Sequence, residues 1–157
     1  MKPLLAIGLG NPLMGDDGVG CVVAERLASD PRLPECTEVI CGGSDLLRYA
    51  GQMEGRNRVL VIDAMQDDTE PGSVLIFEGA RSGLDERQDN AHHLSAVQAI
   101  RLLEMTKSVP CTLLGISVSS VAIGTALSPT VDARLPVILD RVLQELGRGS
   151  PDNMELL

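Results

Sequence analysis

Acidic and imidazole side chains in three separate stretches of the chain have the types needed for a chemical site. Asp17 follows an apolar run and a glycine-rich loop, Asp63 ends a second apolar run, and His92 follows a long polar stretch. Two carboxylates and an imidazole form an oxygen and nitrogen donor set that suits a divalent metal ion and leaves positions open for substrate. A carboxylate can instead act as a general base toward water. The first hypothesis is a site formed by Asp17, Asp63 and His92.

Each of these residues also has a simpler interpretation. Asp17 in the first turn of a helix would complement the helix dipole. A histidine before a helix is often a surface or capping residue, and His93 is the alternative if the register shifts by one. Asp16 is expected to be a cap or a supporting group rather than a ligand. The hypothesis therefore depends on the stretches coming together in the fold.

The glycine-rich stretch from Leu4 to Gly20 reads LLAIGLGNPLMGDDGVG. It resembles a dinucleotide-binding loop, but that fingerprint needs a third glycine where this chain has Leu13. Adjacent aspartates would also repel a phosphate group. The loop therefore favours a cation or a proton over a nucleotide.

Composition excludes several classes of protein. The chain has 157 residues and a formal net charge of -9, which predicts one domain and argues against nucleic-acid binding. It lacks a signal peptide and any apolar stretch of membrane-spanning length, so we expect a cytoplasmic protein with no membrane partner. Its four cysteines form no CxxC motif, which favours buried free thiols, including Cys41.

Apolar runs bounded by turn residues predict five strands, and 3.6-residue periodicity predicts helices between them. Alternation of the two indicates a three-layer α/β/α sandwich over residues 1–148, with a disordered tail at 149–157. The link from 64 to 72 is too short for a parallel crossover, so the fourth strand should be antiparallel. A short helix should be capped by Ser44, and Pro136 should kink or divide the last helix. The predicted strands are Leu4–Leu9, Thr37–Cys41, Arg58–Asp63, Ser73–Glu78 and Thr112–Val118.

The sheet explains how distant residues would meet. If the first strand is central and flanked by the second and third, helices leave on opposite faces and create a crevice at the switch point. Asp17 and Asp63 would both open onto that crevice. Cys41, at the end of the second strand, would lie beside it.

Several motifs together resemble the nickel–iron hydrogenase maturation endopeptidases. The opening GLGNPLMGDDGVG is similar to the leading motif of that family, and VIDA, PGS and LSPTV occur in the expected order. The segment His92–Ser95 resembles a further family motif, and Gly-Gly-Ser follows Cys41 where many members have an aspartate before the two glycines.

The resemblance implies a function and a ligand set. Family members remove a C-terminal extension from the hydrogenase large-subunit precursor after nickel insertion. Carried over residue by residue, the ligands would be Asp17, Asp63 and His92, binding nickel that the substrate carries, in a metal-linked aspartic-type endopeptidase. The resemblance also implies a mixed five-stranded sheet of order 2-1-3-5-4 with strand 4 antiparallel.

Two other functions share some of these sequence features. A nickel-binding chaperone or docking module could use the same three residues without hydrolysis. Peptidyl-tRNA hydrolases also open with GLGNP, but this chain continues with Gly15-Asp16-Asp17, and its negative charge suits tRNA poorly.

Overall fold

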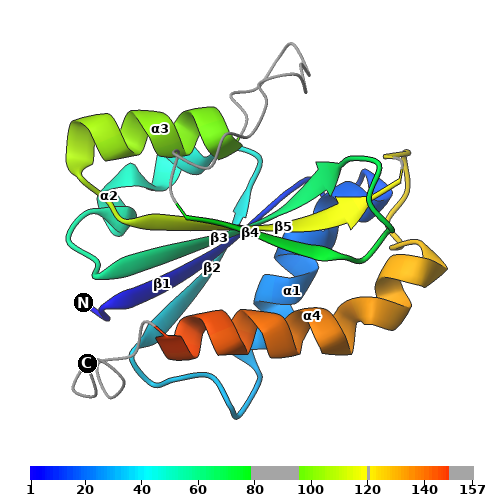
Figure 1. Cartoon of the computed structure of the whole chain (residues 1–157), viewed down its shortest axis with the longest axis horizontal. Helices are drawn as coiled ribbons and strands as arrows, with labels where there is room; N and C mark the ends of the chain where they lie inside the picture. Colours follow the sequence, from blue (N-terminus) through cyan, green and yellow to red (C-terminus); the bar gives the residue numbers. More distant parts are fainter. Residues whose placement is uncertain (79–95, 120, 149–157) are drawn as a thin grey trace.

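The computed structural model describes residues 1–78, 96–119 and 121–148. Its centre is a five-stranded sheet of order β2-β1-β3-β5-β4 (Figure 1). The first three neighbouring pairs are parallel, and β4 runs antiparallel to β5. The predicted mixed sheet, its order and its antiparallel fourth strand are confirmed. The strands are β1 Leu4–Leu9, β2 Thr37–Gly43, β3 Arg58–Gln66, β4 Val74–Glu78 and β5 Cys111–Val118.

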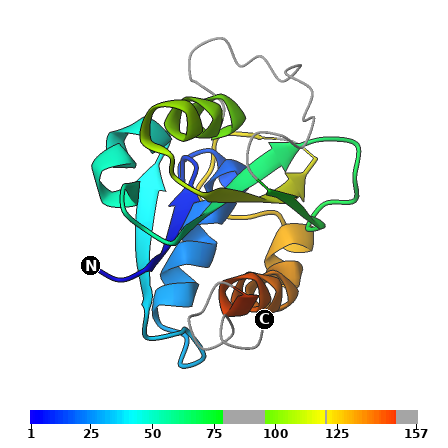
Figure 2. The same cartoon turned by 60° about the vertical axis from the view of Figure 1, so that its left-hand side comes forward.

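Helices cover both faces of the sheet, which gives the predicted three layers (Figures 1 and 2). The helices α1 and α4 pack with one set of buried strand side chains, and η2, α2 and α3 pack with the other. The helices are η1 Gly15–Gly18, α1 Val19–Ala28, η2 Leu46–Tyr49, α2 Ala50–Met53, α3 Ala96–Lys107 and α4 Pro129–Arg148, where η marks a 3-10 helix.

The strand β1, which lies between β2 and β3, is buried along its whole length. Ala6 faces the layer of α1 and α4, whereas Leu5 and Ile7 face the layer of α2 and α3. This alternation follows from the two-residue period of a strand, and an apolar residue at every position suits a strand covered on both faces. Gly8 of β1 lies so close to the backbone of Gly20 in α1 that a side chain at either position would clash. The aliphatic core therefore brings the start of α1 close to the end of β1.

A tight turn joins β3 to the antiparallel β4. Gly72 adopts a φ of 87°, a conformation that favours glycine, and its N–H donates to the carbonyl of Ser117 at 2.8 Å. The N–H of Ser117 donates to the carbonyl of Ser73 at 2.9 Å. These bonds extend the β4–β5 ladder toward the turn, which explains why the seven residues 67–73 are enough for this connection.

One local prediction about helices was wrong, and for the last helix the structure excludes one of the two predicted alternatives, its division into two segments. The carboxylate of Asp45, not Ser44, caps η2 by accepting the N–H of Leu47 at 3.1 Å. The last helix is one continuous α4 that contains Pro136. Pro136 is exposed, so the carbonyl that loses its helical partner can be hydrated.

Within the described ranges, none of the helices has the length and apolar character needed to cross a membrane. The predicted tail at 149–157 lies outside the described residues.

Candidate functional site

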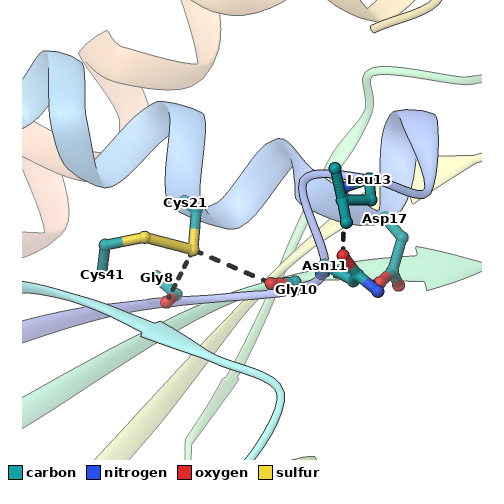
Figure 3. Close-up of a disulfide and its surroundings, with 7 residues drawn as sticks. All are labelled: Gly8, Gly10, Asn11, Leu13, Asp17, Cys21 and Cys41. Atoms are coloured by element: carbon teal, nitrogen blue, oxygen red, sulfur yellow. Dashed lines mark hydrogen bonds between the residues drawn. A yellow bond between two sulfur atoms is a disulfide. The ribbon is translucent and has the colours of Figure 1, made fainter. Parts of the chain in front are cut away.

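Asp17 lies in η1, directly after the loop that leaves β1. One of its carboxylate oxygens, Oδ2, accepts the backbone N–H of Asn11 at 2.8 Å (Figure 3). Gly10 makes this fold of the loop possible, because its φ is 127° and a Cβ there would clash with the backbone carbonyl of Asp17. The glycine-rich loop thus curls back on η1 and fixes one oxygen of Asp17.

Asp16, the preceding residue, has a different environment. Its side chain is buried, and it accepts two hydrogen bonds from Ser128, one from the backbone N–H and one from the hydroxyl, both 2.7 Å long. Ser128 immediately precedes α4. Asp16 thus attaches η1 to the start of α4, and its supporting role at the site stays a prediction.

Asp63 lies on β3, which continues three residues beyond the predicted end of the strand. By strand alternation it is on the same face as Val59 and Val61, the face covered by α2 and α3. The N–H of Ala64 donates to Asp63 Oδ1 at 2.9 Å. Its neighbour on the adjacent strand β5 is Gly115, which has no side chain to cover the carboxylate.

The pKa of Asp63 is raised to about 7. Burial is the largest cause, because it disfavours the charged form, and the negative charge of Asp17 is the second. The hydrogen bond from Ala64 acts in the opposite direction and lowers the pKa. The structure thus brings Asp17 and Asp63, which are 46 positions apart in the chain, close enough to interact electrostatically.

The two histidines, His92 and His93, lie outside the described residues. In the part of the chain that the structure describes, no group of three or more His, Cys, Asp or Glu side chains could hold a metal ion. Of the three predicted site residues, the structure therefore brings together the two carboxylates, and the placement of His92 stays a prediction.

A disulfide joins Cys21 of α1 to Cys41 of β2, so the prediction of free thiols is wrong for these two residues (Figure 3). Cys41 pairs with Gly8 across the β1–β2 ladder, and α1 packs over β1, which places the two Cα atoms 5.1 Å apart. That separation is within the range of disulfides. No CxxC motif marks this pair, because the fold and not local spacing brings the two cysteines together. Cys36 and Cys111 are free.

A hollow at the opposite edge of the sheet contains none of the predicted site residues. The hollow lies where β3 and β5 begin and β4 ends. Its lining residues include Arg58, Glu78 and Thr112. The guanidinium of Arg58 already donates to Thr112 Oγ1 at 3.1 Å and to the carbonyl of Glu145 at 2.6 Å. The edge that carries Asp17 and Asp63 is the better candidate because two carboxylates meet there and the pKa of one of them, Asp63, is raised.

Comparison with known proteins identifies the group to which this architecture belongs. A sequence model described as hydrogenase maturation protease matches residues 21–145, most of the chain. The chain belongs to the hydrogenase maturation protease family. The match also removes the basis for a peptidyl-tRNA hydrolase, which rested on the GLGNP motif alone.

Individual relatives agree with this assignment. The hydrogenase 2 maturation protease of Escherichia coli is 28% identical over 147 residues, which cover 91% of this chain and 90% of the relative. The crystal structure of a hydrogenase 2 maturation peptidase from a Thaumarchaeota archaeon has a TM-score of 0.70 at 28% identity, covering 93% and 99% of the two chains. The [NiFe] hydrogenase maturation protease HycI of Thermococcus kodakarensis has a TM-score of 0.76 at 19% identity and covers 91% of each chain, which shows the shared fold.

Sequence reasoning missed the partners of both aspartates. Ser128 stands in a Ser-Pro pair, a signal for the start of a helix, but nothing in the sequence indicated that it donates both of its protons to Asp16. Asn11 follows the glycines, and nothing in the sequence indicated that its N–H donates to Asp17. This chain therefore has contacts at Asp16 and Asp17 that only the tertiary structure shows.

Proposed function

We propose that this protein is an endopeptidase that removes the C-terminal extension of a nickel–iron hydrogenase large-subunit precursor after nickel insertion, in the cytoplasm. Family membership supports the reaction class and the substrate class. The observation that supports the assignment of the site is that Asp17 and Asp63 both lie at the edge where β1 and β3 end, where the charge of Asp17 helps to raise the pKa of Asp63. Such an edge of an open α/β sheet is where binding sites are usually found.

Asp17, Asp63 and His92 are proposed to bind the nickel that the precursor carries, so the metal is part of the substrate. The donor chemistry of the two described residues fits a divalent ion, because both supply carboxylate oxygens and the positive charge would relieve their mutual repulsion. His92 would complete the set. It precedes α3 by four residues, and α3 covers the face of the sheet that carries Asp63.

The hydrolytic step needs a group that takes a proton from water while the oxygen of that water attacks the scissile carbonyl carbon. The C–N bond then breaks, and the new amino terminus receives a proton. The pKa of Asp63 is about 7 in the metal-free protein and would fall when a divalent ion binds, so Asp63 would act as a ligand rather than as the base. Asp17 is the alternative candidate for the general base. Asp17 has one oxygen fixed by Asn11 and is proposed to orient the metal-bearing end of the substrate.

A chaperone that binds nickel without hydrolysis would use the same three residues, so the decisive experiment detects the product. The precursor is incubated with the protein and its mass is measured. A protease shortens the precursor by the mass of the extension, whereas a chaperone leaves the mass unchanged.

Variants of the predicted site then test the residue assignment. Asp17→Ala, Asp63→Ala and His92→Ala should each abolish cleavage, and His93→Ala should retain it. If His93→Ala abolishes cleavage and His92→Ala does not, the third ligand is His93. Full cleavage by Asp17→Ala or Asp63→Ala would contradict the proposed site.

A further inference from the structure

The carboxylate of Asp16 is buried, which is unusual for an aspartate. Its side chain is 5% exposed, and both of its oxygens accept hydrogen bonds from one residue, Ser128, which lies 112 positions further along the chain. An aspartate is rarely buried this deeply without a specific partner. Asp16 is therefore held by a built contact and is not simply the first acidic residue of a helix.

The partner of Asp16 is fixed to the core. Ser128 precedes Pro129, the first residue of α4, and its carbonyl accepts the N–H of Asp132 at 2.9 Å. The hydroxyl of a serine at this position usually accepts a helix N–H, whereas here it donates to Asp16. The positive end of the α4 dipole also favours a carboxylate at this point. The helix itself is anchored by the buried side chains of Val131, Leu135, Ile138, Leu139, Val142 and Leu146.

Backbone hydrogen bonds join the same two segments. The N–H of Gly15 donates to the carbonyl of Gly124 at 2.7 Å, and the N–H of Gly124 donates to the carbonyl of Leu13 at 2.9 Å. With the Asp16–Ser128 pair, these bonds attach residues 13–16 to residues 124–128. The loop that carries Asp17 is thus fastened on the side that faces α4.

Adjacent side chains in a 3-10 helix point about 120° apart. Because Asp16 is fixed toward Ser128, Asp17 must point in another direction. Its carboxylate accepts the N–H of Asn11, and its charge acts on Asp63. Loss of the inward contact would free η1 to rotate. The direction of Asp17 would then no longer be determined.

We propose that Asp16 is a positioning residue, whose double hydrogen bond to Ser128 fastens η1 to α4 and thereby holds the carboxylate of Asp17 at the site. This inference rests on the proposed function in one respect only, namely that Asp17 binds the substrate metal. The positioning itself has a readout that needs no metal, the hydrogen bond from Asn11 to Asp17.

Two substitutions separate geometry from charge. Asp16→Ala removes both acceptors of Ser128. Asp16→Asn can restore both contacts, because its amide oxygen accepts the Ser128 N–H and its amide NH₂ donates to the hydroxyl oxygen. Glu145→Gln is the matched control for lost stability, since Glu145 is a buried acid at the far end of the same helix and pairs with Arg58 at 3.2 Å.

Amide hydrogen exchange at Asn11 measures the positioning directly. We expect exchange at Asn11 to become at least about tenfold faster in Asp16→Ala, because a lost hydrogen bond of about 1.4 kcal/mol gives that factor. Asp16→Asn should exchange nearly as the original chain does, and Glu145→Gln should leave Asn11 unchanged relative to other core amides. An unchanged rate at Asn11 in folded Asp16→Ala would overturn the proposal.

Calorimetric titration with Ni²⁺ alone provides the functional readout. Removing a group that orients a metal ligand typically weakens binding about 10- to 100-fold, which is the loss expected for Asp16→Ala and not for Asp16→Asn or Glu145→Gln. Asp17→Ala distinguishes the two hypotheses. If Asp17→Ala binds Ni²⁺ as well as the original chain while Asn11 exchange still responds to Asp16→Ala, the ligand assignment fails and the positioning role stands. If Asp17→Ala loses Ni²⁺ but Asp16→Ala does not, the positioning role fails.

Discussion

Asp63 keeps its proton up to a pKa of about 7, first because it is buried and second because the carboxylate of Asp17 lies nearby. This relationship joins the end of β3 to the loop after β1. It has a consequence for stability, because a carboxyl group in the unfolded chain would release its proton near pH 4.

The first prediction concerns the pH dependence of folding. Between about pH 4 and pH 7 the folded state holds a proton on Asp63 that the unfolded state has lost, so this residue makes the folded state less stable as pH rises. Asp63→Asn removes the titration. Its free energy of unfolding, measured in urea from pH 5 to pH 8, should therefore increase relative to the original chain as pH rises and level off above about pH 7. A constant difference between the two curves would contradict the raised pKa.

The second prediction concerns Gly10, whose φ of 127° lets the loop curl onto η1. Gly10→Ala should destabilise the protein by more than about 1 kcal/mol, because the conformation is strained for alanine and the new Cβ meets the carbonyl of Asp17. Gly147→Ala is the control. Gly147 lies in α4, and the position that a Cβ would occupy there is open space. Alanine at this position should therefore be neutral or stabilise the protein by up to about 1 kcal/mol. Equal effects in thermal unfolding would argue against the strained loop.

Much of the fold follows from patterns that a single sequence contains. The predicted bounds of β1 match the observed ones, because a short unbroken apolar run between Lys2-Pro3 and the following glycines is typical of a strand covered on both faces. The antiparallel β4 followed from a link too short to cross the sheet. The ends of β2 and β3 were set too early, because the ladder continues through Gly43 and Gln66, where apolar periodicity has already ended.

The contacts that complete the site had no comparable signal. Asp16 and Ser128 are 112 residues apart, and each alone resembles an ordinary helix cap. Cys21 and Cys41 are 20 residues apart in different elements, so their pairing depends on how closely α1 packs over β1. Asp45 rather than Ser44 caps η2, a choice between two adjacent good capping residues that backbone geometry decides.

The third prediction concerns the reactivity of the free thiols. Burial, and then the charge of Glu104, raises the pKa of Cys111 to about 12, so its thiolate is scarce at pH 8. Cys36 is partly exposed. Iodoacetamide followed by peptide mass spectrometry should therefore label Cys36 quickly and Cys111 only after unfolding. Equal labelling rates in the folded protein would show that Cys111 is accessible.

The fourth prediction concerns the Cys21–Cys41 disulfide. A cross-link between cysteines 20 positions apart lowers the entropy of the unfolded chain and should stabilise the fold by roughly 3 kcal/mol. Reduction with a dithiol, which takes up the disulfide as two thiols and is itself oxidised, should lower the free energy of unfolding by that amount.

The matched control for the disulfide is the double variant Cys21→Ser/Cys41→Ser. Its stability should equal that of the reduced protein and should not change when the dithiol is added. A dithiol effect of the same size in the double variant would assign the stability change to a different group.

The central claim is that Asp17 and Asp63, with His92, act on a precursor that carries its own nickel. The most direct test compares cleavage of nickel-loaded and nickel-free hydrogenase large-subunit precursor by the same enzyme, with product mass as the readout. The account predicts that the nickel-loaded precursor is shortened and that the nickel-free precursor stays intact. The Asp17→Ala variant, used in place of the original enzyme, should cleave neither precursor. Equal cleavage of the loaded and nickel-free precursors would contradict recognition through the metal.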